Sequence, residues 1–397
     1  MIKLRQRYWS SGSKRVMVVA GGTAGHIMAA LAVSDALIGQ GMALDELAFL
    51  TASRDLDREL LPATVYDVVR YQGTGVTKGA TSNARLEFIR KTLSSSLAIL
   101  GPIARWRPKV VVTFGGFYSL VGSFWAKTLG AKVVVVEQNV VLGRANALVS
   151  RVADQVLLAF DETSLPRRVK ERSEVVGNPV RPEIVGLANA RSGPKSSARE
   201  QLGVGRDELV LVITSGSLGA RALNASVAGL FETIDAELSR RNRDEKVRVV
   251  HFQGGKNQVE VDVNMVPNGI DYESRDFDPE LYLWLGAADV VISRAGTSTV
   301  FELFALGVPT IYVPLPNSPK DHQELNAKYA KRRGAAEVVL EGEGFNGRLS
   351  HTLNDVLFEG RKREEMTKSA LACASLDAAQ RVAHAILWWE SYCGGKD

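Results

Sequence analysis

Two stretches of this chain have the same pattern: residues 16–37, VMVVAGGTAGHIMAALAVSDAL, and residues 209–231, LVLVITSGSLGARALNASVAGLF. In each, a continuous apolar run is followed by a glycine-rich loop and then by a helical pattern. This order of buried strand, tight turn and helix is typical of the start of a doubly wound α/β domain. The sequence therefore predicts two Rossmann-like domains facing a shared cleft, an architecture common among proteins that handle nucleotide-containing substrates.

Composition limits the classes of protein to which the chain can belong. Its 397 residues are enough for two domains, and 45% hydrophobic with 23% charged residues is typical of a globular protein. The net charge of +5 permits an anionic partner, but no nucleic-acid-binding signature is present, so nucleic acid is not expected. Cys373 and Cys393 form neither a disulfide framework nor a zinc motif. Residues 1–15 lack the apolar core of a signal peptide, and any membrane contact is expected to be peripheral.

Strands are expected to alternate with helices in both halves. The expected strands cover residues 16–20, 47–51, 109–113, 132–136 and 155–158, then 209–214, 247–252, 289–292, 309–313 and 335–339. Ligands of such sheets bind beyond the carboxyl ends of the strands. In the first half, this edge is expected to carry the loops GGTAGH (21–26), FGGFYS (114–119) and EQNVVLGRAN (137–146).

His26 and Glu137 are the candidate catalytic residues of the first half. The glycines of residues 21–26 let the backbone approach a ligand, but their GGxxG spacing argues against a dinucleotide. His26 stands in the first turn of the following helix, whose N-terminus favours the neutral, proton-accepting form. It is therefore a candidate general base. Glu137 ends an all-valine strand and either takes part in the chemistry or caps loop amides.

Basic and apolar side chains mix in residues 76–109. A helical stripe is expected to face the core: Leu86, Ile89, Leu93, Leu97 and Leu100. Phe88 and Ile99 project nearly opposite this stripe. The cations around them include Lys78, Arg85, Arg90 and Lys91. Such a surface suits an anionic lipid bilayer, and the alternative is a solvated basic helix.

The Asp55-Leu56-Asp57 triplet resembles a metal-binding DxD motif, but it lies in a charged helix start with no third ligand in view. No metal site is predicted from it. In the second half, Ser217 in its glycine-rich loop is placed to meet a phosphate. Glu302, one to two turns into the helix of RAGTSTVFE (294–302), is placed to accept two vicinal hydroxyls. Together these positions describe a nucleotide-sugar, and Arg181 in the hinge sequence GNPVRPEI (177–184) adds a cation.

At this point the motifs resemble a known family. The segments GGTAGH, GGFYS, EQN, VVGNPVRPEI, GSLGARALN, DVVISRAGTSTVFELFALGVPTIYVPLP and DHQELNA resemble, in order, the motifs of the MurG family. The resemblance implies a GT-B fold and an inverting, metal-independent transfer that needs no cofactor. The donor would be UDP-N-acetylglucosamine, and the acceptor an undecaprenyl-linked muramyl-pentapeptide at the cytoplasmic face of the cell membrane.

The resemblance also implies roles for individual residues. The diphosphate would be held by Ser217 and Arg181, and the ribose by Glu302. The uracil would lie against the backbone of Phe277 and Asp278. The sugar would be oriented by Thr297, Ser298, Thr299, Gln323 and Asn139. The junction between donor and acceptor would be faced by Thr23, Ala24, Gly25 and His26. The segment 76–105 would dock on the membrane.

The resemblance leaves some points open. Ala24 stands where the family usually has a glycine, and the loop 314–321 is one residue longer than is common.

The expected divisions are a basic tail (1–14), a first domain (15–177), a second domain (178–365) and a C-terminal helical segment (366–397) that packs back on the first domain. The alternative functions are another GT-B lipid glycosyltransferase and a UDP-N-acetylglucosamine 2-epimerase.

Overall fold

The computed structural model describes residues 14–62, 65–71, 96–216, 219–241, 246–276 and 278–394. This part of the chain forms two compact units. The first comprises the described residues up to Val180 together with those from Asp377 onward, and the second comprises Arg181–Leu376. Lys14, expected in the basic tail, is instead fully buried and pairs with Asp67. It therefore belongs to the body of the first unit.

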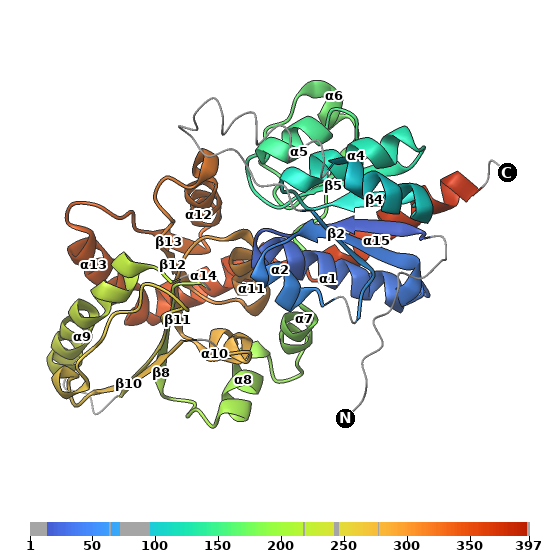
Figure 1. The fold of residues 1–397 in the computed structure, drawn as a ribbon. Coiled ribbons are helices and arrows are strands. Elements are labelled where there is room, and N and C mark those ends of the chain that lie inside the picture. Colours follow the sequence, from blue (N-terminus) through green and yellow to red (C-terminus); the bar gives the residue numbers. More distant parts are fainter. Residues whose placement is uncertain are drawn as a thin grey trace, which may run out of the picture. The chain divides into compact units, whose positions relative to one another are not determined.

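The first unit is built on a seven-stranded parallel sheet with the order β3-β2-β1-β4-β5-β6-β7 (Figure 1). The strands are β1 (Val16–Val19), β2 (Leu47–Ala52), β3 (Val68–Tyr71), β4 (Val110–Thr113), β5 (Lys132–Glu137), β6 (Gln155–Leu158) and β7 (Ser173–Val175). The order reverses between β1 and β4. That reversal is where the ligands of a doubly wound sheet bind, beyond the carboxyl ends of the strands.

Helices cover both faces of this sheet. They are α1 (Ala24–Gly39), α2 (Asp55–Leu60), the helical residues 96–106, α4 (Phe117–Thr128), α5 (Arg144–Val149), α6 (Arg167–Lys170) and α15 (Ala378–Gly394). Val18 packs in one core with Val33 of α1 and Ile386 of α15, whereas Val19 packs in another core with Trp106. Because alternate strand residues enter different cores, the strands read as continuous apolar runs.

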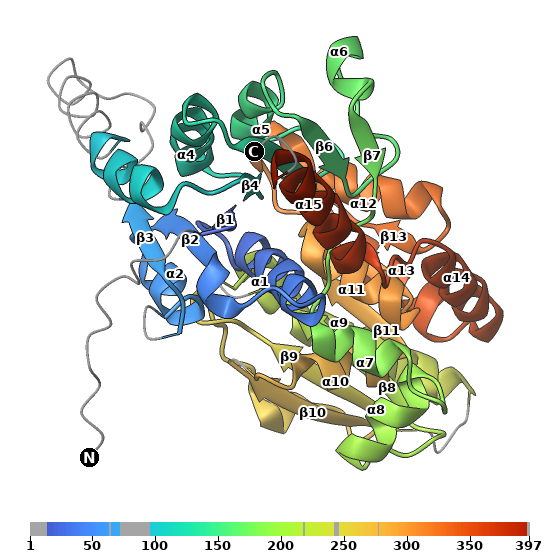
Figure 2. The same ribbon diagram turned by 90° about the vertical axis from the view of Figure 1, so that its right-hand side faces the viewer.

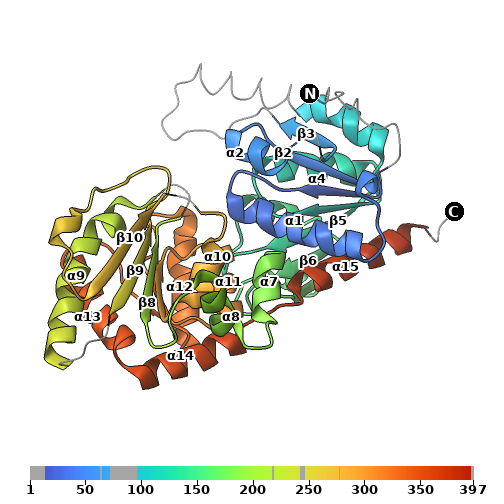
Figure 3. The same cartoon turned by 90° about the horizontal axis from the view of Figure 1, so that it is seen from below.

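The C-terminal helix α15 is part of the first unit, and it packs against α1 (Figures 2 and 3). Glu390 of α15 accepts hydrogen bonds from Arg15 at 2.7 Å and from Lys109 at 2.8 Å. The preceding helix α14 (Gly360–Ala372) belongs to the second unit and packs against α11 (Thr297–Leu306). The C-terminal segment of the first unit thus starts at Asp377 rather than at residue 366.

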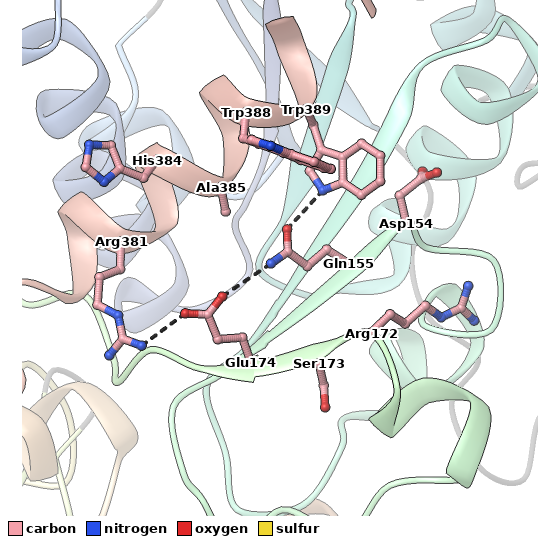
Figure 4. A pocket seen from close by; sticks show the side chains of 10 residues that line it. All are labelled: Asp154, Gln155, Arg172, Ser173, Glu174, Arg381, His384, Ala385, Trp388 and Trp389. Carbon is pink, nitrogen blue, oxygen red and sulfur yellow. Dashed lines mark hydrogen bonds and ion pairs between the residues drawn. The ribbon is translucent and has the colours of Figure 1, made fainter. Parts of the chain in front are cut away.

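An open groove of about 830 Å³ separates α15 from β6 and β7 (Figure 4). Trp389 donates to Gln155 at 2.9 Å, and Arg381 donates to Glu174 at 3.1 Å. Trp388 is 57% exposed and packs its indole against Trp389 and Tyr392 of the same helix. Because the groove is lined from the amino ends of β6 and β7, it lies away from the edge where doubly wound sheets bind ligands.

The predicted exposure of Ile99 is wrong. Ile99 is 2% exposed and packs with Ile103 and Trp106, whereas Leu97, expected in the core, is 61% exposed. In the described part of this helix, Ile99, Ile103 and Trp106 are spaced by four and three residues and lie on the buried face. This orientation turns Leu97 outward. The other predicted membrane residues lie outside the described residues: Lys78, Arg85, Phe88, Arg90 and Lys91.

The second unit repeats the architecture with a six-stranded parallel sheet of order β10-β9-β8-β11-β12-β13 (Figures 1 and 3). Its strands are β8 (Leu209–Thr214), β9 (Val247–Phe252), β10 (Ile270–Arg275), β11 (Val290–Ser293), β12 (Thr310–Tyr312) and β13 (Ala336–Val338). Its remaining helices are α7 (Pro182–Ala188), α8 (Pro194–Leu202), α9 (Arg221–Arg241), α10 (Leu281–Ala287), α12 (His322–Arg332) and α13 (Phe345–Leu357). The prediction of two doubly wound domains is confirmed. Among the described helices, none is long and apolar enough to cross a membrane.

Candidate active site

The glycine loop after β1 leads directly into α1. The backbone of Gly22 has φ +76°, in the left-handed region that glycine adopts without strain. Thr23 is the N-cap of α1, and its hydroxyl accepts a hydrogen bond from the His26 amide at 3.3 Å. Ala24 and Gly25 form the first helical turn. His26 therefore stands in that first turn, as predicted, at the carboxyl end of β1.

The imidazole of His26 is held in one tautomer. Its Nδ1 lies 3.2 Å from the carbonyl oxygen of Gly21. A carbonyl oxygen only accepts hydrogen bonds, so Nδ1 carries the hydrogen and the ring lone pair is on Nε2. The ring carbon Cε1 would lie 3.4 Å from a Cβ atom on Gly115, in the loop after β4. His26 thus occupies the reversal point between β1 and β4, with Nε2 as its proton acceptor.

Glu137 is a buried carboxylate whose oxygens are fully used. Oε1 accepts hydrogen bonds from the backbone and side-chain nitrogens of Asn139 at 2.9 and 3.2 Å. Oε2 accepts from the Gly143 amide at 2.8 Å and from Asn146 at 3.0 Å. Burial raises the pKa of Glu137, and these donors oppose that rise. The geometry favours the capping interpretation, in which Glu137 orders the loop 138–146.

Asn146 connects this loop to the histidine. Its amide nitrogen would lie 3.7 Å from a Cβ atom on Gly115, the same glycine that the His26 ring faces. The structure therefore brings the loops after β1, β4 and β5 together around His26. Asn139, predicted to orient the sugar, is held by Glu137 at this edge. That role remains a prediction.

In the second unit, α11 begins at Thr297, so Thr297, Ser298 and Thr299 form its first turn as predicted. Asn326 of α12 is fully buried and donates to Thr297 Oγ1 at 3.1 Å and to the Ala295 carbonyl at 3.2 Å. These bonds fix α12 against the start of α11.

Gln323, one residue into α12, faces the loop that follows β12. Its carbonyl oxygen accepts from the Leu315 amide at 3.0 Å. In the same loop, Asn317, Lys320 and Asp321 have positive φ values of 54°, 57° and 53°. Three non-glycine residues in the left-handed region are unusual in one short loop, and such strain clusters at ligand sites. The extra loop length noted in the sequence is thus accommodated by strained backbone beside a predicted sugar-binding residue.

Glu302 and Arg181 form an ion pair that sequence reasoning did not predict. Arg181 Nε donates to Oε1 at 2.8 Å, and Nη2 approaches Oε2 at 3.3 Å. Glu302 is 8% exposed; burial raises its pKa, and the Arg181 guanidinium opposes that rise. Both residues were assigned to the donor nucleotide. The structure brings them together at one end of the second sheet, with the carboxylate oriented by the guanidinium.

The second glycine-rich loop rests on a buried polar network. His251 is fully buried and contacts Asn224 at 3.0 Å and the Tyr272 hydroxyl at 3.1 Å. Asn224 also accepts from the Ser215 hydroxyl, which begins the loop. Burial lowers the pKa of His251 to about 4, so the ring stays neutral at neutral pH. A histidine within a strand carries no sequence signal for such a support, and it was not predicted.

Close backbone packing also shapes this loop. A Cβ atom on Gly219 would overlap the Lys256 carbonyl oxygen, so only glycine fits there. Ser217 and Phe277 lie outside the described residues. The Asp278 carboxylate pairs with Arg275 and accepts from the Glu280 amide at 2.7 Å, and the Asp278 carbonyl oxygen accepts from the Leu281 amide at 3.2 Å, so the predicted uracil contact stays a prediction.

The burial of Asp57 beneath the glycine loop was not predicted from its sequence context. It is fully buried, and its Oδ1 accepts from the Gly22 amide at 2.8 Å and from the Thr51 hydroxyl at 2.7 Å. A Cβ atom on Gly21 would overlap both of these side chains. Asp55 is exposed. Within the described residues, no three acidic, histidine or cysteine side chains gather as a metal site.

A doubly wound sheet in each unit, with its ligand edge lined by glycine loops, is the architecture of the GT-B glycosyltransferases. The glycosyltransferase family 28 N-terminal domain matches residues 16–158, and the family 28 C-terminal domain matches residues 210–382. A solved structure of MurG from Acinetobacter baumannii is 26% identical, with a TM-score of 0.71 over 94% of this chain and 99% of that one.

Two relatives make the assignment more specific. One from Aeromonas hydrophila is 35% identical over 94% of this chain and 96% of its own length, and one from Caldicellulosiruptor saccharolyticus is 31% identical over 94% and 97%. Both are named UDP-N-acetylglucosamine–N-acetylmuramyl-(pentapeptide) pyrophosphoryl-undecaprenol N-acetylglucosamine transferase. The chain belongs to the MurG family of glycosyltransferases. The predicted resemblance, the GT-B fold and the enzyme class are thereby confirmed.

Proposed function

We propose that this enzyme transfers N-acetylglucosamine from UDP to the C4 hydroxyl of the muramyl sugar in undecaprenyl-diphospho-N-acetylmuramoyl-pentapeptide, in peptidoglycan synthesis. The observation that supports this most strongly is the match of nearly the whole chain to transferases named for this donor and acceptor. The His26 loop in the first unit and the Arg181–Glu302 pair in the second supply the chemical groups that such a transfer needs.

His26 acts as the general base. Nε2 takes the proton from the acceptor hydroxyl as the hydroxyl oxygen attacks the anomeric carbon from the face opposite UDP. The bond from the anomeric carbon to the diphosphate oxygen breaks, and UDP leaves with the bonding electrons, so the configuration inverts. The contact between Nδ1 and the Gly21 carbonyl supports this role because it presents Nε2 as the acceptor. General-base catalysis of this kind is typically worth ~10²–10⁴-fold.

The second unit binds the donor. Glu302 accepts the ribose hydroxyls, and Arg181 and the loop of Ser217 meet the diphosphate. The start of α11 and Gln323 orient the sugar, and the backbone at Phe277 and Asp278 meets the uracil. Backbone amides and the guanidinium offset the charge that develops on the leaving diphosphate. Full activity in the presence of a chelator is therefore expected.

The acceptor carries a lipid, so the enzyme works at the cytoplasmic face of the membrane as a peripheral protein. The cations Lys78, Arg85, Arg90 and Lys91, with Phe88, remain our proposed contact with anionic lipid. Ile99 is replaced in this role by Leu97, which is 61% exposed, and Phe124 of α4, which is 59% exposed. A hydrogen bond from Trp125 to Ser96 at 3.0 Å supports placing Leu97 and Phe124 on one apolar surface.

An acceptor panel tests the proposal against its alternatives. The enzyme is incubated with labelled UDP-N-acetylglucosamine and, separately, a short-chain lipid-linked muramyl-pentapeptide, a diacylglycerol, a polyprenyl phosphate, or no acceptor. We expect transfer only to the muramyl acceptor, undiminished by EDTA. Transfer to another lipid would indicate a different lipid glycosyltransferase, and turnover of the donor alone would indicate an epimerase.

A further inference from the structure

The buried carboxylate of Asp57 faces the catalytic histidine across a single peptide group. The peptide that joins Gly21 to Gly22 has its N–H directed at Asp57 Oδ1, 2.8 Å away. The carbonyl oxygen of the same peptide accepts from His26 Nδ1 at 3.2 Å. Carboxylate, peptide and imidazole therefore form one continuous line of hydrogen bonds.

We propose that Asp57 is a positioning residue that acts on His26 through the Gly21–Gly22 peptide, fixing its tautomer and stabilising the imidazolium formed during transfer. This inference rests on the proposed role of His26 as the base. The negative charge of Asp57 polarises the peptide, which places more negative charge on the Gly21 oxygen. The bond from Nδ1–H then strengthens as Nε2 takes the proton from the acceptor hydroxyl.

The two oxygens of the Asp57 carboxylate have different surroundings, and Oδ2 is buried without a hydrogen-bond partner among the described residues. Both bonds to Oδ1 come from donors, the Gly22 amide and the Thr51 hydroxyl. Arg70 of β3 donates to the Asp57 carbonyl at 3.3 Å and places a cation beside it. Since the carboxylate is fully buried, its charge acts through a medium of lower dielectric constant than water.

The loop cannot easily take another position. A Cβ atom on Gly21 would overlap Asp57 and Thr51 and would lie 3.0 Å from the Tyr118 hydroxyl. Arg54 donates to the Gly22 carbonyl at 3.0 Å from the exposed side. The next peptide is thus also held, and the Gly21–Gly22 peptide keeps its N–H toward Asp57 and its carbonyl toward His26.

The charged and titratable groups that surround His26 come from several elements. Asp57 belongs to α2, Arg54 is the N-cap residue before that helix, and Glu137 at the end of β5 contacts Asn146. Tyr118 of α4 is buried, and burial raises the pKa of its hydroxyl, so it remains neutral. Asp57 differs from the others because it is joined to the imidazole through one peptide group.

Asp57→Asn removes the negative charge of the side chain while keeping an oxygen that can accept the same hydrogen bonds. An amide oxygen still accepts from Gly22 and Thr51, so the loop is kept while the charge is lost. Without the charge the imidazolium is less stable, and the acidic limb of the kcat/KM profile should move to lower pH by about 0.5–1 unit. The plateau of kcat should fall about three- to tenfold because a weaker base accepts the proton less readily.

Two matched variants serve as controls. Asp55→Asn removes a charge from an exposed position on the same helix, and Thr51→Val removes a neutral hydrogen bond to the same Oδ1. Neither should move the acidic limb. An Asp57→Asn enzyme with an unchanged limb and an unchanged kcat would overturn the proposal, because a merely structural carboxylate tolerates this substitution.

An NMR titration of the resting protein separates this inference from the proposed function. The His26 ring should titrate at lower pH in Asp57→Asn than in the wild type, and the Gly22 amide nitrogen of the wild type should follow the His26 titration. The Gly22 measurement stands even if the variant does not fold. If neither effect appears while His26→Ala is inactive, the relay is wrong and the base assignment stands. If both appear while His26→Ala remains active, the relay exists and the base lies elsewhere.

Discussion

Glu302→Ala should weaken binding of the UDP donor, because it removes the carboxylate that accepts hydrogen bonds from the ribose hydroxyls. Two hydrogen bonds to a charged group are lost, each worth ~1.5–3 kcal/mol. Part of this loss is offset because Arg181, which now uses Nε and Nη2 on Glu302, is released toward the diphosphate. We therefore expect a loss of about 3 kcal/mol, or roughly 100-fold in Kd for UDP.

Calorimetric titration with uridine and with UDP distinguishes contacts to the ribose from contacts to the diphosphate. Glu302→Ala should weaken both ligands, whereas Arg181→Lys should spare uridine, because it keeps a cation beside Glu302 and loses only the bidentate fork. Burial raises the pKa of Glu302, so wild-type uridine affinity should start to fall on acidification at a higher pH than an exposed glutamate would give. Glu302→Gln should lack that fall.

The control for this experiment is Glu343→Ala, an exposed glutamate of the same unit, which should bind both ligands normally. Denaturant unfolding checks that each variant is folded. If Glu302→Ala binds uridine as tightly as wild type, the carboxylate does not contact the ribose, and the assignment of the donor site is wrong.

Three further outcomes are expected. His26→Ala should lower kcat by ~10²-fold or more while UDP affinity, measured by titration, changes little; near-normal turnover would remove His26 as the base. The pKa of His251 is about 6.5 in the unfolded chain and about 4 in the folded protein, because burial disfavours the charged ring. The free energy of unfolding should therefore drop by up to about 3 kcal/mol as the pH falls from 6.5 to 4. His251→Asn should abolish this pH dependence. Reversal of Arg90 and Lys91 to Glu should reduce sedimentation with anionic vesicles, as added salt does, without affecting turnover of a short-chain acceptor; unchanged sedimentation would place the docking surface elsewhere.

The buried strands could be predicted from the sequence because helices cover both faces of each sheet. The strands β3, β7 and β10 were not predicted. All three are edge strands, and in β10, IDYESR, only Ile270 is buried while the other positions are partly or fully exposed. An edge strand pairs on one side only and tolerates charge, so it lacks the continuous apolar run that marks a central strand.

In the candidate site, too, sequence patterns predicted the local features but not the contacts between distant segments. His26 and the Thr297 turn are local features, because a strand, a glycine turn and a helix start follow one another in the chain. Asp57 was read as part of a charged helix start, and its partner is a backbone amide 35 positions away. Ile99 was misplaced because helical spacing gives the angle between side chains but not which face meets the sheet. Such contacts arise only when distant segments fold together.

The linkage of the sugar product tests the central claim most directly. The enzyme is incubated with UDP-N-acetylglucosamine and a short-chain lipid-linked muramyl-pentapeptide, and the product is examined by proton NMR. We predict a β-linked N-acetylglucosamine on the C4 oxygen of the muramyl sugar, the inverse of the α configuration in the donor. An α linkage, attachment at another hydroxyl, or no disaccharide from folded enzyme would contradict the account.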